Sequence, residues 1–526
     1  MEHRWLLPGT DRTAVTGFTK TGTELPTDDL TVGLWLRGKD SGIQERALAL
    51  LAQPIQQRTY LNLAQLIKEF GPDPADIAKV AAFAQKHRLQ PQSFSGNSRL
   101  LPLKVTVQQA KKLFDTDLSL YTSTSGHQYR GRTGAISLLK EDFVETNPVL
   151  AVFGLDNRRQ AKHFSVETAV APGQYPPAAY GFPVSSQANP QSDPHEQGTE
   201  SPLTGNNITV GVIGFGGSIS AATLAPLVPQ AQIAIAPPQP ITQPDGRFNT
   251  EIINDVQIIH ACAPNARITV YAFDRTDLGW ISGLNSILQS ESIPSILSIS
   301  WGWPEVNNTN PQNGPLWTTT SINALEDIFA ALTLRGVSIV VSTGDSGPQV
   351  SYPSSSAFVL ACGGTTIVPT GNEVVWCSGL GSSAGGISSL VAMPDWQKQA
   401  AIQCRSNSGC VNPAKRSVPD VAASASYAAI TGTSAATPLW AALLALANEF
   451  LTNQKMPVAG HVNSLLYQNN SPLQTACRDI ETLNNAYPPG STPCFSASRG
   501  WDACTGWGSP QVIPFIQALA DIMDQK

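Results

Sequence analysis

The most informative stretch of the sequence is Thr431-Gly432-Thr433-Ser434-Ala435-Ala436-Thr437-Pro438-Leu439-Trp440. It predicts a serine at the start of a buried helix, because small residues surround Ser434 and an apolar run continues to Ala447. Backbone N–H groups at a helix N-terminus are unpaired and can stabilise negative charge. A serine hydroxyl becomes a good nucleophile only when a neighbouring base takes its proton. The rest of the chain therefore has to supply that base.

The usual base is histidine, and no histidine motif of that kind is present. The sequence holds 7 histidines, none in a His-Gly-Thr-His type segment. The best carboxylates are Glu251 and Asp255, which share one face of a predicted helix because they are four residues apart. Such a pair is usually a solvated helix face. Beside a serine, it predicts a coupled carboxyl pair in which one member accepts the serine proton.

A third acidic residue follows a predicted buried strand. The β-branched run from Val337 to Val341 is typical of such a strand, and it ends in the turn Gly344-Asp345-Ser346-Gly347. An aspartate in a turn of this kind usually bonds its own backbone. Together with Ser434 and the acid pair, Asp345 becomes a candidate for the same site.

Two other motifs match well-known patterns and are weaker. The stretch Gly381-Ser382-Ser383-Ala384-Gly385 has the spacing of a G-x-S-x-G nucleophile elbow, but no strong strand precedes it and no long helix follows. We interpret it as a Gly/Ser loop. Gly214-Phe215-Gly216-Gly217 lacks the third glycine of a dinucleotide fingerprint, because Ile219 stands there, and predicts a tight turn.

The ordered motifs resemble the sedolisin family of serine-carboxyl peptidases, and in particular its kumamolisin-like members. The similarity rests on Glu251-x-x-x-Asp255-x-Gln257, Ser342-x-Gly344-Asp345-Ser346-Gly347, Gly432-Thr433-Ser434-x-x-x-Pro438, Ser298-Ile299-Ser300-Trp301-Gly302 and Tyr352-Pro353-Ser354-Ser355. It extends from about Tyr175 to the C-terminus. The resemblance implies that Ser434 is the nucleophile, Glu251 its general base, Asp255 the residue that orients Glu251, Asp345 the oxyanion stabiliser, and Trp301 a support for the acid pair.

The implied activity is hydrolysis of peptide bonds in proteins through an acyl-enzyme on Ser434, in acid. Asp345 can donate a hydrogen bond to an oxyanion only while it is protonated, and the ordinary pKa of aspartate is ~3.9. A histidine base would already be protonated at that pH. Two alternatives stay open: a catalytically idle binding protein with the peptidase fold, and a peptidase whose propeptide inhibits it permanently.

The resemblance also implies one structural Ca²⁺ near the C-terminus. Its ligands would be the carboxylates of Asp479 and Asp502 and the backbone carbonyls of Ile480, Ser498 and Gly500. Calcium prefers such oxygen ligands. Without the resemblance, two aspartates in a Gly-rich loop would be interpreted as turn formers.

The charge distribution divides the 526 residues into two unlike parts. Residues 1–165 hold 21 Lys and Arg against 16 Asp and Glu, whereas residues 166–526 hold 12 against 23. The cations are scattered and no aromatic-basic motif occurs, so nucleic-acid binding is not expected. The asymmetry predicts instead that the basic part docks on the acidic part.

The basic part resembles the activation domain of prokumamolisin-type zymogens, an α/β sandwich of ferredoxin-like kind. Its predicted elements are strands at 30–36 and 100–105 and helices at 59–72, 73–87 and 107–114. We predict an activation domain at 1–165, a linker with the processing region at 166–205, and a catalytic domain at 206–526. The propeptide would inhibit the enzyme and be removed by self-cleavage at acidic pH.

The acidic part alternates strand and helix patterns. Strands are predicted at 208–213, 268–273, 296–300 and 337–341, and helices at 251–262, 279–289 and 320–335. This alternation predicts a parallel sheet flanked by helices, consistent with a subtilisin-like α/β fold. Cys262 and Cys362 lie in apolar runs and are expected to be buried thiols.

Location is predicted less directly. No run of eighteen apolar residues and no secretory signal is visible, so no membrane span is expected. All eight cysteines fall in the acidic part, which favours an extracytoplasmic protein. The family resemblance implies an extracellular monomer that acts on protein or peptide substrates.

Overall fold

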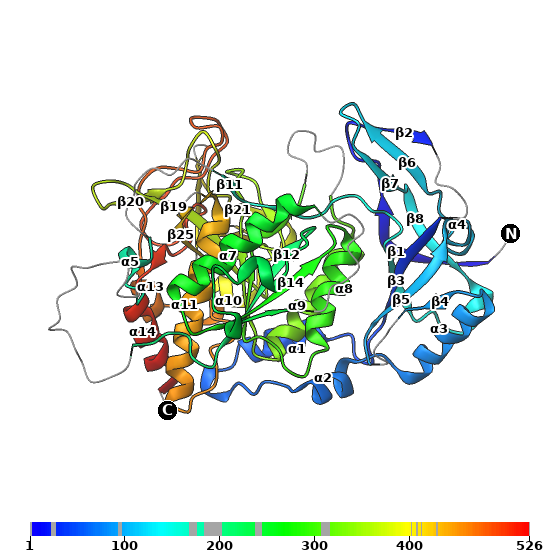
Figure 1. Ribbon diagram of the computed structural model, residues 1–526, viewed down its shortest axis with the longest axis horizontal. Coiled ribbons are helices and arrows are strands. Elements are labelled where there is room, and N and C mark those ends of the chain that lie inside the picture. The colour runs from blue at the N-terminus through cyan, green and yellow to red at the C-terminus, as the bar shows by residue number, and fades with distance from the viewer. Residues whose placement is uncertain are drawn as a thin grey trace.

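The computed structural model (Figure 1) describes residues 3–22, 28–92, 97–167, 176–183, 202–236, 245–306, 316–400, 402–406, 409–411, 413–427 and 430–524. An α/β unit with a large central sheet occupies one side of the molecule. A smaller unit, built from the N-terminal residues, lies against it.

The large unit is organised by an eight-stranded sheet. Seven strands form a continuous path in the order β13 (Ile233–Ile235), β14 (Arg267–Phe273), β12 (Thr209–Phe215), β15 (Ile296–Ile299), β17 (Ser338–Ser342), β19 (Leu360–Ile367) and β20 (Glu373–Val375). The eighth, β25 (Val421–Ser424), pairs with β19. All pairings are parallel except that of β20 with β19. The predicted strands and the subtilisin-like fold class are confirmed.

Helices pack against this sheet. The main ones are α7 (Asn249–Cys262), α8 (Asp277–Leu288), α9 (Thr319–Leu334), α11 (Thr433–Asn453) and α14 (Val512–Asp524). The three predicted helices correspond to α7, α8 and α9 within two residues at each end. Both Cys262, at the end of α7, and Cys362, in β19, are buried thiols as expected.

Helix α11, with 21 residues, is the longest helix among the described residues. Among the described residues it alone is long and apolar enough to cross a membrane, and 89% of the qualifying window is buried inside the protein. Its apolar character is therefore accounted for by its contacts with α7, β17, β19 and β25 in the core.

The smaller unit contains a four-stranded antiparallel sheet. In chain order its elements are β3 (Asp29–Leu36), α3 (Pro74–Lys86), β4 (Gln90–Pro91), β5 (Leu100–Thr106), α4 (Val107–Phe114) and β9 (Val149–Phe153). The strand order is β4-β5-β3-β9, so the first and third strands are central, as in a ferredoxin-like βαββαβ unit. This unit has a hydrophobic core of its own.

A second layer of the smaller unit comes from shorter strands. They are β1 (Arg4–Arg12) with β8 (Gly134–Leu139), and β2 (Phe18–Gly22) with β6 (Ser119–Ser123) and β7 (Gln128–Gly131). The short turn η2 (Lys140–Asp142) also belongs to this unit. Two helices from the same N-terminal part, α1 (Ile43–Leu51) and α2 (Leu63–Phe70), and the turn η1 (Ile55–Gln57) between them lie instead along the large unit, where their buried apolar side chains join its core (Figure 1).

The remaining short elements belong to the large unit or lead into it. They are β10 (Lys162–His163), β11 (Val166–Glu167), α5 (Pro176–Tyr180), α6 (Ala221–Leu224), η3 (Gln230–Gln232), η4 (Gly246–Phe248), β16 (Trp301–Pro304), β18 (Ser351–Tyr352), β21 (Gly386–Ala392), α10 (Asp395–Lys398), β22 (Cys404–Ser406), β23 (Gly409–Val411), β24 (Lys415–Val418), β26 (Ser426–Tyr427), β27 (Ile430–Thr431), α12 (Asn463–Leu466), α13 (Pro472–Thr475), β28 (Cys477–Arg478) and β29 (Ser509–Pro510).

Local sequence explains why the helix predicted from residue 59 begins later. The side chain of Asn62 accepts the N–H of Gln65, and the Gln65 side chain accepts the N–H of Asn62, which forms a capping box. The helix therefore starts at Leu63, and the chain before it stays extended. Helix α1 was not predicted, although its buried residues Ile43, Ala47, Leu50 and Leu51 have helical spacing.

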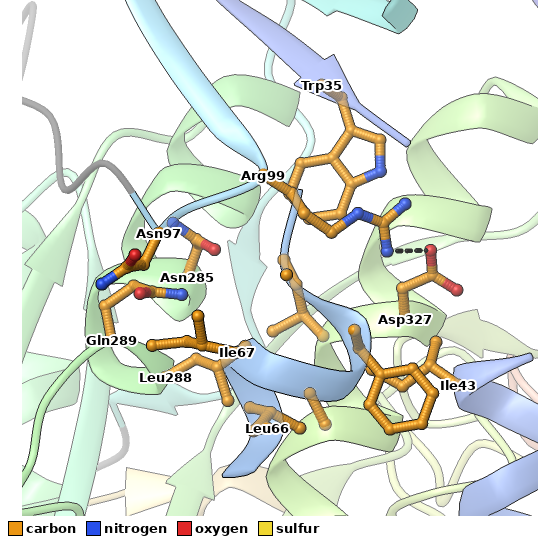
Figure 2. A pocket seen from close by; sticks show the side chains of 14 residues that line it. Trp35, Ile43, Leu66, Ile67, Asn97, Arg99, Asn285, Leu288, Gln289 and Asp327 are labelled. Atoms are coloured by element: carbon orange, nitrogen blue, oxygen red, sulfur yellow. Dashed lines mark hydrogen bonds and ion pairs between the residues drawn. The ribbon is translucent and has the colours of Figure 1, made fainter. Parts of the chain in front are cut away.

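Ion pairs join the two units. Arg12 Nη2 lies 2.8 Å from Asp277 Oδ2, and these side chains are 3% and 7% exposed. Figure 2 shows the second pair, in which Arg99 Nη1 lies 2.8 Å from Asp327 Oδ2. The Arg99 guanidinium also stacks over the ring of Trp35. In both pairs the cation comes from the basic N-terminal part and the carboxylate from the acidic part.

Candidate active site

Ser434 is the second residue of α11 and is buried. The helix contains Pro438, whose ring nitrogen cannot donate to the carbonyl of residue 434 four positions earlier. That carbonyl instead lies 3.4 Å from Ser300 Oγ. The proline thus couples the start of α11 to the loop after β15.

The predicted acid pair lies beside Ser434. Glu251 and Asp255 project from α7 and are both buried. Asp255 Oδ1 accepts a hydrogen bond of 2.8 Å from Ser300 Oγ. Glu251 Oε1 and Asp255 Oδ2 have no hydrogen-bond partner among the described residues.

Burial shifts the protonation of both carboxyls. It raises the pKa of Glu251 to about 7, against the opposing effect of hydrogen bonds with Ser165 and Ser434. Burial, and then repulsion from Glu251, raises the pKa of Asp255 well above its ordinary value. The pair therefore retains a proton at pH values where isolated carboxyls have lost theirs.

Asp345 is hydrogen-bonded to Thr433, the residue before Ser434. Its Oδ1 accepts hydrogen bonds of 2.9 Å from both the N–H and the Oγ1 of Thr433. Burial raises the pKa of Asp345 to about 8, although the bonds from Thr433 favour the ionised form. Asp345 is consequently protonated throughout the acid range.

Gly432 keeps space open between these groups. It has φ +151°, and a Cβ atom at this position would lie 2.1 Å from the carbonyl oxygen of Phe164 and 2.7 Å from Asp345 Oδ2. Both oxygens therefore face the same point beside Gly432. No side chain larger than hydrogen fits there.

A segment of the N-terminal part crosses the site as an extended strand. On one side, β10 pairs antiparallel with β16, with Lys162 opposite Gly302 and His163 opposite Trp301. On the other side, β11 pairs antiparallel with β27 at residues 430–431. Phe164 and Ser165 lie between the two pairings.

The Phe164–Ser165 peptide bond lies at the serine. The N–H of Phe164 donates to Ser434 Oγ at 3.2 Å, and the carbonyl of Phe164 accepts the N–H of Ser434 at 3.1 Å. The hydroxyl of Ser165 donates to Glu251 Oε2. This bond thus has the nucleophile, the acid pair and the helix N-terminus around it.

The side chains of this segment fill the cleft. The Phe164 ring is buried against Gly302 and Gly344, where added Cβ atoms would lie 2.9 Å and 3.2 Å from ring carbons. His163 Nδ1 lies 3.6 Å from Glu251 Oε2, and its ring contacts the indole of Trp301.

Sequence reasoning missed this segment, because it divided residues 162–167 between the end of the activation domain and the start of the linker at residue 166. The only local signal is that Phe164 is the one Phe, Tyr or Trp between Phe153 and Tyr175. The contact with Ser434 spans 270 positions in the sequence, and no periodicity reveals it.

Trp301 packs among aromatic rings near the acid pair. Its ring contacts His163, Phe215 and Phe248 at centroid distances of 5.4, 5.6 and 5.8 Å. Its indole N–H has no hydrogen-bond partner among the described residues. Its link to Glu251 runs through the His163 ring, and its role as a support for the pair stays a prediction.

The two rejected motifs have structural roles. Ser383 is buried, donates to the carbonyl of Cys504 at 2.6 Å and accepts the N–H of Gly364 at 2.9 Å, so it is not a nucleophile elbow. Gly216 has φ +73° in the turn after β12, as the tight-turn interpretation predicts.

The predicted calcium ligands converge on one loop. Asp479 Oδ2 accepts the N–H of Gly500 at 2.7 Å, and Asp502 Oδ2 accepts the N–H of Ser498 at 3.1 Å. Asp502 is fully buried, and within the described chain no cation pairs with it. The described residues include no group of three or more His, Cys, Asp or Glu side chains suited to a metal. Any site here would need backbone carbonyls.

Comparison with known proteins defines the class. The protein-family model "Pro-kumamolisin, activation domain" matches residues 16–158, and the family model "Subtilase family" matches residues 246–486. The chain is thus a subtilase-fold peptidase preceded by an activation domain.

Individual relatives define the family. Kumamolisin of Bacillus sp. (strain MN-32) is 30% identical over 517 residues, covering 88% of this chain and 86% of that protein. Sedolisin of Pseudomonas sp. (strain 101) is 26% identical, covering 88% and 83%. The solved structure of Pseudomonas sedolisin complexed with pseudo-iodotyrostatin has a TM-score of 0.52 at 24% identity, covering 68% of this chain and all of that one, and supports the fold. The protein belongs to the sedolisin–kumamolisin family of serine-type peptidases.

Proposed function

We propose that the chain is the zymogen of an acid-acting endopeptidase that first cuts its own Phe164–Ser165 bond and then cleaves other proteins. The observation that carries this proposal is the extended segment 162–167, which is β-paired on both sides of Ser434 with the Phe164 carbonyl on the Ser434 N–H. A peptide substrate would need the same register.

Each group has one role in the proposed reaction. Glu251 takes the proton of Ser434 Oγ, and the oxygen attacks the Phe164 carbonyl carbon. The negative charge that develops on the carbonyl oxygen is stabilised by the Ser434 N–H and by protonated Asp345. The proton then passes to the nitrogen of Ser165, the C–N bond breaks, and water hydrolyses the acyl-enzyme by the reverse sequence.

Two protonation needs bound the working range. Asp345 must carry its proton, and its pKa of about 8 ensures this at any acidic pH. Glu251 must have lost its proton to act as base, and because burial raises its pKa to about 7, only a small fraction of the uncut chain has Glu251 ionised at pH 4. Asp255, whose pKa is also raised, holds the proton that the pair retains, and we assign it the role of orienting Glu251.

The division of the chain follows the same logic. We assign residues 1–165 to the activation domain, 166–205 to the linker and 206–526 to the catalytic domain, and we place the processing site at the end of the activation domain, before Ser165, rather than in the linker. Because the segment before Ser165 fills the cleft, the activation domain inhibits the uncut enzyme. We further propose an extracellular monomer that acts on proteins or peptides and binds neither nucleic acid nor membranes.

We also propose one structural Ca²⁺ at the loop 498–502. Asp479 and Asp502 would hold it with the carbonyls of Ile480, Ser498 and Gly500, an all-oxygen set of the kind calcium prefers. The support is that Asp502 is buried without a counter-charge among the described residues. Thermal melts at pH 5 with calcium and with chelator test it. Equal melting temperatures and no bound metal by elemental analysis would refute it.

The test of the peptidase assignment is self-processing followed by mass spectrometry. At pH 4, the wild-type chain should yield fragments 1–164 and 165–526, losing about a third of its mass, and should then digest casein. Ser434→Ala should stay full length. Processing of Ser434→Ala at the wild-type rate by itself would refute self-cleavage, and absence of any casein digestion after full activation would favour the idle binding protein.

A further inference from the structure

The activation domain holds the peptidase at a second place, far from Ser434. The residues Gln53–Leu61, which connect α1 to α2, form a strap along the large unit (Figure 1, the blue chain at the lower edge). We propose that the groove under this strap is an exosite of the peptidase, which keeps the activation domain bound after the chain has been cut.

Arg58 is the first anchor of the strap. Its guanidinium is buried, and its two terminal nitrogens donate to the carbonyl of His461 at 3.3 Å and to Ser464 Oγ at 2.8 Å. Within its own segment it donates to the carbonyls of Leu51 and Gln53. No carboxylate pairs with Arg58 in the part of the chain that the structure describes. The groove therefore recognises the guanidinium by a set of fixed neutral acceptors.

Tyr60 is the second anchor. Its hydroxyl donates to the carbonyl of Ala459 at 3.3 Å. Its ring lies over two glycines: a Cβ atom at Gly336 would be 2.7 Å from the ring, and one at Gly460 would be 2.2 Å from the hydroxyl. The next residue, Leu61, donates its N–H to the carbonyl of Leu334 at 2.8 Å. The peptidase side thus has a slot that fits one phenol and one extended backbone.

The groove and the active site lie at opposite ends of strand β17. Gly336 precedes β17, and Asp345 follows it. A strand of five residues rises ~17 Å at about 3.3 Å per residue, so the two places are at least this far apart. Cutting at Phe164–Ser165 leaves every strap contact in place.

Helix α2, which follows the strap, also contacts the large unit. Figure 2 shows that Leu66 and Ile67 of α2 line a pocket together with Leu288 of α8 and the Arg99–Asp327 ion pair. The partner that fits the exosite is therefore the released activation domain itself, presenting an Arg-x-Tyr-Leu sequence. Inhibition of the enzyme by the released fragment rests on the proposed self-cleavage. Binding of the strap in the exosite does not depend on self-cleavage.

The test uses a chain that cannot cut itself. A recognition sequence for an added site-specific protease is inserted after Val170 in the Ser434→Ala chain, and the dissociation constant of the two fragments is measured at neutral pH after nicking. Gly336→Ala pushes a methyl group into the Tyr60 ring. The matched control is Gly371→Ala, because Gly371 has a similar φ of +87° but nothing within 4 Å of its added Cβ.

We expect Tyr60→Ala and Gly336→Ala each to raise the dissociation constant at least tenfold, and the double variant to be no weaker than Tyr60→Ala alone. Gly371→Ala should have no effect. A synthetic peptide of residues 53–61 should compete, and the same peptide with Arg58→Ala should not; this arm needs no variant of the peptidase to fold. Equal affinities for Gly336→Ala and Gly371→Ala, or failure of the peptide to compete, would overturn the exosite. Failure of self-processing would be seen separately, in the wild-type chain.

Discussion

Replacement of Asp345 by asparagine and by alanine separates two roles that the structure suggests for this carboxyl. The Thr433 N–H and Oγ1–H both donate to Oδ1, so an acceptor is needed at that position. In Asp345→Asn the amide oxygen would take this position, and the NH₂ group would then replace the protonated Oδ2 beside the Phe164 carbonyl. An asparagine can therefore still donate to the oxyanion, whereas alanine cannot.

The magnitudes follow from this geometry. Loss of one oxyanion donor typically costs 10²–10³ in kcat, or about 2.7–4 kcal/mol. We expect that loss for Asp345→Ala, and a loss of no more than about tenfold, ~1.4 kcal/mol, for Asp345→Asn at pH 4. Because the carboxyl has a pKa of about 8, wild-type activity should fall as pH rises through 8, where Asp345 loses the proton that it donates. The amide does not titrate, so this alkaline limb should disappear in Asp345→Asn.

The assay is the single-turnover rate of self-cleavage, followed by gel densitometry between pH 3 and 9, with folding checked by thermal melts. Ser434→Ala is the inactive control, in which no self-cleavage is expected. If Asp345→Asn proves as inactive as Asp345→Ala at pH 4 while both fold, the carboxyl must transfer its proton rather than only donate a hydrogen bond, and the assigned role is wrong.

Three further predictions use other groups. Burial in the uncut chain raises the pKa of Glu251 to about 7, although the hydrogen bond from Ser165 of the covering segment opposes this shift. When the segment leaves, water reaches the carboxyl, so the acid limb of self-cleavage should lie at a higher pH than the acid limb of kcat/KM for the cut enzyme on a peptide. Coincident limbs would contradict the assignment of Glu251 as base. Burial raises the pKa of Glu326 to about 7, so the native state binds an extra proton between about pH 4.5 and 7 and loses up to ~3 kcal/mol of stability as pH rises through that window. Glu326→Gln should therefore raise the melting temperature at pH 8 but not at pH 4, and an equal change at both pH values would count against it. Finally, Asp277→Ala leaves the buried Arg12 guanidinium without its carboxylate partner and should destabilise the uncut chain by about 3–5 kcal/mol. The control is Asp117→Ala, which removes the exposed pair with Lys20 and should change the melting temperature little. Similar melting temperatures for the two variants would show that the Arg12 pair contributes little.

The sequence alone was sufficient to predict helices and strands with a regular hydrophobic period, and the turns at their ends. Hydrophobic periodicity predicted α7, α8, α9 and four sheet strands to within two residues, because burial of one face imposes the period. The spacing of Glu251 and Asp255 placed both carboxyls on one helix face. The turns that carry Asp345 and Ser434 were recognisable because small residues follow a strand or precede a helix.

Only the tertiary structure brought these groups together and showed what covers them. The segment that carries His163 and Phe164 has no period of its own, since its backbone pairs with strands more than 130 positions away, and its conformation is set by those partners. The same holds for Arg58 and Tyr60, whose acceptors are carbonyls about 400 residues later in the chain. A carbonyl oxygen is present at every residue, so the sequence carries no mark of which ones will bind. Local pattern therefore decided which side chains could react, and long-range packing decided which peptide lies in front of them.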